Sequence, residues 1–361
     1  MISFWVDQPG SFTITNYLSS RGAAIADRFA VRFYEQLGPR LAVLRGPHIL
    51  SALDQLTPAQ LAAARSIADQ LSLAHPGIAV LNHPARVLFR PELLRALARE
   101  GLNDYRVHEA DEVEGAIRFP VFVREAHRHT GNATGLVHSS RDLEHALAML
   151  RLRGHRLRDL LVVEFCDTAD ANGVYRKYAA VKVGNAILPA HMMAGDHWMV
   201  KSSGDRPNVE LAEEALHFVE ENPHEEWLRQ VFTIAGADYG RIDYGVLNGR
   251  PQAWEVNLNP TVGRNPAKRP RDLPAEVAGI RDRAREGFHE RLRAAFAALD
   301  QPHDGETVAV GLDPHLLQAI AAETARARRR RSVIGALQRL YEHPWVGRPF
   351  RTVYTKFFTR V

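Results

Sequence analysis

The chain has 361 residues, of which 45% are hydrophobic and 8% aromatic. This length exceeds one ordinary hydrophobic core, so two or three compact units are expected. No apolar run reaches the roughly 18 residues that would cross a membrane, and the N-terminus lacks the basic start and apolar core of a signal peptide. Cys166 is the only cysteine, which excludes internal disulfides and cysteine-based zinc sites. We therefore expect a cytoplasmic protein.

The net charge of +4 is concentrated near the C-terminus. Residues 301–361 carry ten Lys or Arg against five Asp or Glu. Arg326 and the run Arg328–Arg331 lie in a helical-looking segment that begins after Asp313-Pro314. This basic tail either binds an anionic surface or an acidic partner, or it is the solvated face of a terminal helix. No nucleic-acid-binding motif accompanies it.

Residues 1–84 alternate helix and strand patterns and predict a small α/β domain. Apolar residues recur every four positions from Ile25 to Leu37, which predicts a helix that Gly38-Pro39 ends. Thr57-Pro58 followed by Gln60 has the pattern of a capping box with a first-turn proline, so a second helix should begin there. Ile78–Leu81 reads as a short buried strand.

Residues 85–165 predict a strand–loop–helix unit. A helix over Pro91–Arg99 ends at Gly101, and Phe119–Arg124 is a strand that terminates in a cation. The loop from Glu125 to Gly135 contains glycines, threonines and an asparagine, which can turn backbone N–H groups towards phosphate oxygens. A helix from Ser139 or Ser140 to Arg153 and a buried strand over Leu160–Cys166 follow.

Residues 166–300 predict antiparallel strands followed by helices and a second hairpin. Lys177–Val183 and Ala186–Ala190 are strands joined by a Gly184-Asn185 turn. Helices are expected over Val209–Glu221 and His224–Ala235. They lead into two further strands, Tyr239–Val246 and Gln252–Asn257.

The last two strands carry the most informative side chains of the chain. Glu255 and Asn257 are two residues apart and share a face of their strand. Asp243 joins that face only if it lies opposite Glu255, because a plain two-residue Asn248-Gly249 turn would place it opposite Trp254. A metal site therefore requires a three- or five-residue loop or a β-bulge. Oxygen ligands of this kind, together with substrate phosphates, suit Mg²⁺. The alternative is an ordinary surface hairpin with two scattered acids.

Over about residues 80–265 the chain resembles the ATP-grasp superfamily. Its sequence is similar to those of a group of bacterial ATP-grasp proteins without an assigned substrate. The resemblance implies an N-terminal α/β domain (1–84), a central lid subdomain (85–165), a C-terminal antiparallel-sheet subdomain with the metal site (166–300) and a basic helical tail (301–361). The metal motif falls on Asp243, Glu255 and Asn257. Arg241 matches an arginine that faces the transferred phosphoryl group, which makes it the candidate catalytic residue.

The resemblance also implies the nucleotide-binding residues. Asn82-His-Pro84 with Arg90 resembles the first nucleotide-contacting segment, and the strand ending at Arg124 resembles the second. Glu164-Phe165-Cys166 resembles the hinge whose backbone reads adenine. The lid over the phosphates is expected to include four residues of the glycine loop: Gly131, Asn132, Thr134 and Gly135. The family usually has lysines where Arg90 and Arg124 stand, and arginine changes reach and geometry at a phosphate.

Other polar residues carry weaker expectations. One of Lys177, Lys182 and Lys201 is expected to touch phosphate or substrate, with Lys182 taken as the nucleotide-binding one. The implied cofactors are ATP and two Mg²⁺ ions, with Mn²⁺ as a substitute, and a homodimer fits the family.

The implied activity is ADP-forming ligation of a carboxylate to an amine through an acyl phosphate. Two alternatives stay open. One is a phosphotransferase acting on a hydroxyl, and the other is a non-catalytic nucleotide-binding protein docked through its basic tail.

Overall fold

The computed structural model describes residues 1–75, 77–113, 116–127, 131–200, 208–263, 273–300, 305–326 and residue 329. The chain forms two compact units. The first comprises residues 1–104 and 166–317, and the second comprises residues 105–165 with the residues that follow Leu317. The four-part division expected from the sequence, with a boundary at 84/85, stays a prediction.

The first unit begins with a parallel sheet of the order β2-β1-β4-β5. Its elements are β1 (Ile2–Val6), α1 (Phe12–Leu18), β2 (Phe29–Phe33), β3 (Arg40–Leu44), β4 (His48–Leu50), α2 (Pro58–Ala74) and β5 (Val80–Leu81), with short 3₁₀ turns at Ala23–Arg28, Tyr34–Gln36 and Leu53–Gln55. The capping box at the start of α2 is confirmed, since the Thr57 side chain accepts from the Gln60 backbone and the Gln60 side chain accepts from the Thr57 backbone.

The predicted helix over Ile25–Leu37 is wrong. Residues 29–33 form strand β2, which pairs in parallel with β1 from Ile2↔Phe29 to Val6↔Phe33. Phe29, Val31 and Phe33 also alternate with a period of two, and this pattern competes with the period of four. Pairing with an all-buried β1 decided the outcome, because tertiary contacts override weak local preference.

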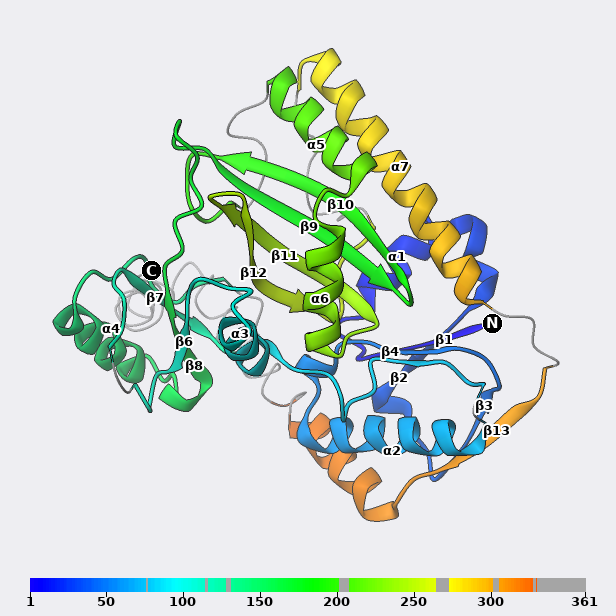
Figure 1. Cartoon of the computed structure of the whole chain (residues 1–361). Helices are drawn as coiled ribbons and strands as arrows, with labels where there is room; N and C mark the ends of the chain where they lie inside the picture. The colour runs from blue at the N-terminus through cyan, green and yellow to red at the C-terminus, as the bar shows by residue number, and fades with distance from the viewer. Residues whose placement is uncertain are drawn as a thin grey trace, which may run out of the picture. The chain divides into compact units, whose positions relative to one another are not determined.

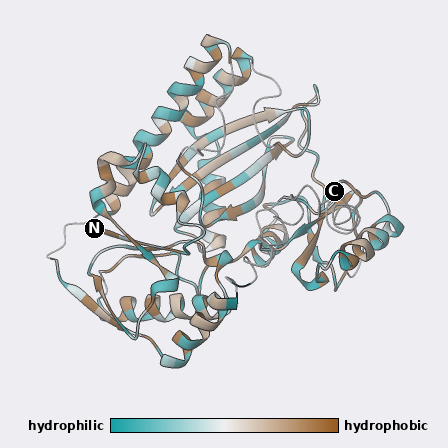
Figure 2. Ribbon diagram, turned by 180° about the vertical axis from the view of Figure 1, so that it is seen from behind, coloured by the Kyte–Doolittle hydropathy of each residue, from teal (hydrophilic) through white to brown (hydrophobic). Residues whose placement is uncertain are grey.

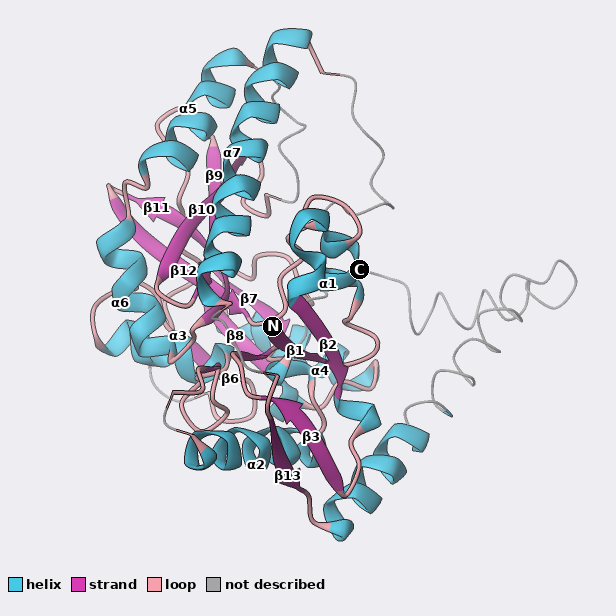
Figure 3. Ribbon diagram, turned by 90° about the vertical axis from the view of Figure 1, so that its right-hand side faces the viewer, coloured by secondary structure: helices cyan, strands magenta, loops and turns pink. Residues whose placement is uncertain are grey.

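The second sheet of this unit is antiparallel, with the order β10-β9-β11-β12 (Figure 1). Its strands are β9 (Tyr175–Val183), β10 (Ala186–Gly195), β11 (Tyr239–Leu247) and β12 (Arg250–Asn257). Three helices accompany it: α5 (Val209–Glu221), α6 (Glu225–Ala235) and α7 (Ala275–Leu299). Figure 3 shows α5 and α7 lying side by side. The predicted hairpins and helices over 177–257 are confirmed, with strand bounds one to five residues longer at some ends.

Aromatic side chains join the two sheets in one core. Phe4 of β1 meets Tyr239 of β11 edge to face at 5.5 Å between ring centroids. Phe296 of α7 contacts both Tyr239 and Phe29 of β2. Such pairs add to the burial energy of large apolar side chains. Figure 2 shows α7 with hydrophobic residues on some sides and hydrophilic ones on others, as expected for a helix that covers a core.

The unit also contains α3 (Arg90–Arg99), as the sequence predicts, and β13 (Thr307–Gly311). β13 pairs antiparallel with β3, so a segment far along the chain completes a two-stranded sheet with residues 40–44. Residues 314–326 and residue 329 are helical. Of the predicted basic run, Arg328, Arg330 and Arg331 lie outside the described residues.

The second unit contains a sheet of the order β6-β8-β7 and one helix among its residues 105–165 that the structure describes. The elements are β6 (Val107–Glu109), β7 (Val121–Glu125), α4 (Ser140–Leu152), a 3₁₀ turn at Leu157–Asp159, and β8 (Leu160–Glu164). Leu143 and Leu150 of α4 pack with Val121, Val123 and Val162 of the strands. The predicted strand–loop–helix order is confirmed. The mixed character of the fold, α/β at the start and antiparallel after residue 166, is also confirmed. Across the described part of the chain, no helix is long and apolar enough to span a bilayer.

Candidate nucleotide and metal site

A β-bulge brings the three predicted metal ligands to one face of the hairpin. The turn is the tight two-residue one, with Asn248 and Gly249 at φ values of 49° and 77°, which is typical of a type I′ hairpin. From the turn the register runs regularly to Tyr244↔Ala253, and then shifts so that Asp243 pairs with Glu255 and Arg241 with Asn257. The extra residue is Trp254. Of the arrangements that the metal hypothesis required, the structure has the bulge.

Asp243 is the centre of the charge cluster. Its side chain is buried, with 3% of the residue exposed. Arg241 donates to it through Nε at 2.8 Å and Nη2 at 3.2 Å. Lys177 of β9 places Nζ 2.7 Å from Oδ2 of the same carboxylate. Two cations therefore share one buried acid.

These contacts set the ionisation of the cluster. Burial alone would raise the pKa of Asp243, but Arg241 and Lys177 outweigh it, so the pKa lies below its usual value. Burial would lower the pKa of Arg241, whereas Asp243 raises it above its ordinary range. Both groups are charged at neutral pH. An ionised carboxylate is what a hard cation needs as a ligand.

Glu255 and Asn257 have partners of their own. Arg90, the first residue of α3, reaches Oε2 of Glu255 through Nη2 at 2.5 Å, and both side chains are largely buried. Oδ1 of Asn257 accepts from the backbone N–H of Asn259 at 2.8 Å. Arg90, expected from the sequence to contact nucleotide, is thus brought to the metal hairpin.

The oxygen atoms of Asp243, Glu255 and Asn257 suit a Mg²⁺ ion that is also bound by a nucleotide better than a metal ion held by protein side chains alone. Among the residues that the structure describes, no group of three or more His, Cys, Asp and Glu side chains could hold a metal ion. Two carboxylates and one amide are too few for a complete protein cage, but Mg²⁺ usually takes one or two carboxylates and completes its shell with phosphates and water. Arg90, Lys177 and Arg241 exceed the two acids in charge, which favours a polyanion such as a triphosphate.

The structure separates Lys177 from Lys182. Lys177 and Ala179 share a face of β9, and Ala179 pairs with Asp243. Lys182 belongs to the opposite face, where it donates to the carbonyl of Ala237 at 2.9 Å and lies over the ring of Phe232 in α6. The site is thus built with Lys177, and Lys182 is not brought to it. Lys201 lies outside the described residues.

The second unit holds Arg124 and the glycine loop. The loop folds back along β7, where Arg124 forms a bridge with Asn132 and Val121 with Val137. The Thr134 hydroxyl accepts from the backbone N–H of Val123 at 2.9 Å and donates to the carbonyl of Gly135 at 2.8 Å. Gly131 has a φ of 95°. Residues 128–130 of the predicted glycine loop lie outside the described part of the chain.

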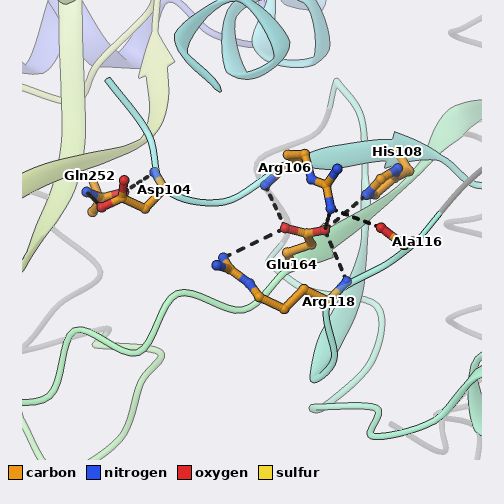
Figure 4. Close-up of polar contacts among 7 residues, drawn as sticks. All are labelled: Asp104, Arg106, His108, Ala116, Arg118, Glu164 and Gln252. Carbon is orange, nitrogen blue, oxygen red and sulfur yellow. Dashed lines mark hydrogen bonds and ion pairs between the residues drawn. The ribbon is translucent and has the colours of Figure 1, made fainter. Parts of the chain in front are cut away.

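Glu164 of the predicted adenine hinge is the centre of a polar cluster (Figure 4). Its carboxylate accepts from the backbone N–H groups of Arg106 and Arg118, both at 3.1 Å. The guanidinium of Arg106 is 3.1 Å away and the His108 ring 3.4 Å. Burial would raise the pKa of Glu164, but the hydrogen bonds from Arg118 and Arg106 lower it below its usual value. The side chain therefore has a structural role.

The backbone of this hinge is also engaged. The N–H of Glu164 donates to Arg106 at 3.0 Å and the N–H of Phe165 to Pro120 at 2.9 Å. Cys166 is half-buried, and the boundary between the two units falls between it and Phe165. Recognition of adenine at this strand stays a prediction.

Sequence reasoning missed two buried amide side chains near the hairpin, Asn103 and Gln252, and named Asn82 only as part of a nucleotide-contacting segment. Asn82 donates to the carbonyl of Tyr239 at 2.7 Å and accepts from its N–H at 2.9 Å. Asn103 likewise donates to the carbonyl of Ala253 and accepts from its N–H. No sequence signal marks such residues, because a buried amide is recognised only by the backbone that it faces. The sequence could have shown that Lys177 and Lys182 face opposite sides of one strand, because they are an odd number of residues apart, but not which of them faces Asp243.

No protein-family model matches the sequence, and no curated protein matches it. Solved structures do match. The D-alanine–D-alanine ligase from Coxiella burnetii has a TM-score of 0.45 and 12% identity over 82% of this chain and 97% of that one. The ATP-grasp ligase PsnB, in complex with a phosphomimetic variant of its minimal precursor, Mg and ADP, has a TM-score of 0.44 and 12% identity over 82% and 96%.

A third match is the L-amino acid ligase from Bacillus licheniformis, with a TM-score of 0.36 and 12% identity. It covers 71% of this chain, and the chain spans 66% of that ligase. The structural neighbours include ATP-grasp ligases.

Proposed function

We propose that the protein is an ATP- and Mg²⁺-dependent ligase that joins a carboxylate to an amine and releases ADP and phosphate. The observation that carries the proposal is the set of oxygen ligands Asp243, Glu255 and Asn257 on one face of the hairpin, surrounded by Arg90, Lys177 and Arg241. The metal and phosphate residues do not separate a ligase from a phosphotransferase of the same fold, so the choice of a ligase rests on the activity that the ATP-grasp resemblance implies.

The proposed role of each side chain follows from its charge. Asp243, Glu255 and Asn257 would hold Mg²⁺, which when bound neutralises charge on the β- and γ-phosphates. Arg90 and Lys177 would bind phosphate oxygens. Arg241 would stabilise the charge that develops on the transferred phosphoryl group and on the tetrahedral adduct formed when an amine attacks the acyl phosphate. For Arg124 and the loop residues 131–135 of the second unit, nucleotide binding is proposed from the ATP-grasp resemblance alone.

The reaction balances without a further reactant. An oxygen of the substrate carboxylate attacks the γ-phosphorus, and the bond from that phosphorus to the β–γ bridging oxygen breaks, which leaves ADP. The amine then attacks the acyl carbon, phosphate departs, and the amine loses a proton. The product is an amide.

A product assay tests the proposal. The protein is incubated with Mg-ATP and pools of carboxylic acids and amines, with phosphate measured enzymatically and amides by mass spectrometry. We expect phosphate release that needs both an acid and an amine. Arg241→Ala should lower the rate by about 10²-fold, whereas Arg229→Ala, which removes an exposed arginine on α6, should not.

Two outcomes would reject the ligase. Recovery of the γ-phosphate on a hydroxyl compound would assign a phosphotransferase. Binding of Mg-ATP without turnover in any pool would assign a nucleotide-binding protein.

A further inference from the structure

The bulge in β12 decides whether the metal hairpin has a metal site. Without the extra residue Trp254, Asp243 would face position 254 and Glu255 would turn to the opposite side of the sheet, because a one-residue slip exchanges the faces of a strand. β12 is at the edge of its sheet, where bulges are common and re-aim side chains. Something must hold the strand in this irregular form on the side that has no neighbouring strand in the described sheet.

The side chain of Asn103 lies on that side of β12, where it contacts Ala253, the residue before the bulged Trp254. Its Nδ2 donates to the carbonyl of Ala253 at 3.0 Å, and its Oδ1 accepts from the N–H of Ala253 at 2.8 Å. One side-chain amide thus makes both hydrogen bonds that a neighbouring strand would make. Asn103 is 4% exposed, so water does not replace these bonds at low cost.

The neighbouring residues Gln252 and Asp104 make a second contact between the same two segments. Gln252 of β12 is fully buried. Its Oε1 accepts from the backbone N–H of Asp104 at 2.7 Å, and its Nε2 donates to the Asp104 carboxylate at 3.0 Å. The segment 103–104 is therefore hydrogen-bonded to Gln252 and Ala253, the two residues of β12 that precede Trp254.

Helix α3 sets the position of Asn103. After Arg99 the chain turns through Gly101, at a φ of 68°, and the N–H groups of Leu102 and Asn103 both donate to the carbonyl of Leu97. This helix end fixes where Asn103 points. Arg90, at the other end of α3, is paired with Glu255. The segment from Arg90 to Asn103 therefore contacts β12 on both sides of the bulge.

We propose that Asn103 is a positioning residue, whose amide holds the β12 bulge and thereby keeps Glu255 opposite Asp243 for metal binding. The proposal rests on the proposed Mg-nucleotide site. It gives Asn103 no contact with substrate or metal. Its effect passes through the backbone of Ala253.

The test compares Asn103→Ala with Leu71→Ala, a buried leucine in α2. Leu71→Ala should cost a few kcal/mol of stability without touching the hairpin. The first measurement is the Mg²⁺ concentration for half-maximal binding of a fluorescent ATP analogue. We expect Asn103→Ala to raise it about tenfold, in line with the loss of supporting contacts at other metal sites, and Leu71→Ala to leave it unchanged. An unchanged value in Asn103→Ala would overturn the proposal.

Hydrogen–deuterium exchange provides a second measurement that does not depend on nucleotide binding. Asn103→Ala should speed exchange in peptides covering residues 252–257 while β9 and α2 stay as in the parent protein. Exchange unchanged over 252–257 would overturn the proposal even if the parent protein bound no nucleotide. An absence of Mg²⁺-dependent binding in the parent protein would instead reject the proposed function. If Asn103→Ala does not fold, Asn103→Ser, which retains one hydrogen-bonding group, takes its place with the same expected direction.

Discussion

At the scale of single residues, the candidate site is built from charges that neutralise one another. Asp243 is shared by Arg241 and Lys177, and Glu255 is paired with Arg90. Leaving any one of these groups buried without its partner would be costly. The same pairs favour the ionised carboxylates, and the excess of cations provides the attraction for a phosphate chain.

Lys177 and Lys182 provide a matched pair of variants. Lys177→Met removes a cation from Asp243, so the pKa of Asp243 should rise and Mg-nucleotide binding should weaken by about tenfold, or ~1.4 kcal/mol. Lys182→Met removes a hydrogen bond to Ala237 on the opposite face. It should cost roughly 1 kcal/mol of stability and leave nucleotide affinity as it was.

Calorimetric titration of Mg-ATP into both variants checks this prediction, with unfolding temperatures as the measure of stability. If Lys182→Met weakened binding and Lys177→Met did not, the nucleotide would have to contact the other face of the sheet. That result would restore the sequence-based expectation for Lys182.

At the scale of elements, helix ends are fixed by close contacts as well as by capping. α6 ends at Gly236, whose φ of 60° favours glycine. A Cβ placed there would also lie 2.2 Å from the carbonyl oxygen of Arg86. The N–H of Leu88 donates to Ala235 at 2.9 Å, so the segment leading to α3 is held against the end of α6.

Gly236→Ala and Gly101→Ala separate the backbone strain of a positive φ from the steric contact with a neighbouring segment. Gly101 follows α3 with a φ of 68°, but no atom lies within 4 Å of the position that an alanine methyl group would take there. Gly101→Ala should therefore cost roughly 1 kcal/mol from backbone strain alone, and Gly236→Ala roughly 2–4 kcal/mol because the 86–88 segment must also move. Chemical denaturation measures both. Equal losses would mean that the contact with Arg86 relaxes without cost.

At the scale of the whole molecule, a buried neutral histidine links stability to pH. His48 is fully buried in the parallel sheet. The Trp5 indole N–H donates to Nδ1 at 3.0 Å, so Nδ1 must accept, and Nε2 is left to donate to the Leu44 carbonyl at 3.1 Å. Both ring nitrogens are satisfied only in the neutral form. Burial lowers the pKa of His48 to about 4.

Acid should therefore destabilise the fold. The pKa in the folded state lies below the unfolded value of about 6.5, so the contribution of His48 is complete above pH 6.5 and is lost as pH falls towards 4. Between pH 7 and pH 5 the expected loss is ~2 kcal/mol. Buried His289, whose pKa burial also lowers to about 4, acts in the same window.

Urea denaturation at pH 7 and pH 5 measures this loss. His48→Gln, which can accept from Trp5 and donate to Leu44 without titrating, should reduce the loss between pH 7 and pH 5 by ~2 kcal/mol. His315→Gln, in the segment after β13, should leave it unchanged. A pH dependence that His48→Gln does not reduce would contradict the assignment.

The sequence by itself determined the features whose cause is local. The capping box at Thr57 and Gln60, the end of α3 at Gly101, and the helix that follows Ser139 depend on groups a few residues apart, so a short stretch of sequence contains all of their partners. The candidate oxygen ligands Asp243, Glu255 and Asn257 were also recognisable in sequence, together with the condition that a bulge or an odd loop must bring them to one face.

Only the tertiary structure decided which side chains meet. Residues 29–33 became a strand because β1 was available to pair with them. The bulge at Trp254 was selected over a longer loop, with Asn103 and Gln252 on its open side. Lys177 reached Asp243 because β9 lies beside β11 in a register that the sequence does not state. These outcomes depend on partners tens or hundreds of residues away, and the burial that makes each contact strong exists only after the sheets have formed.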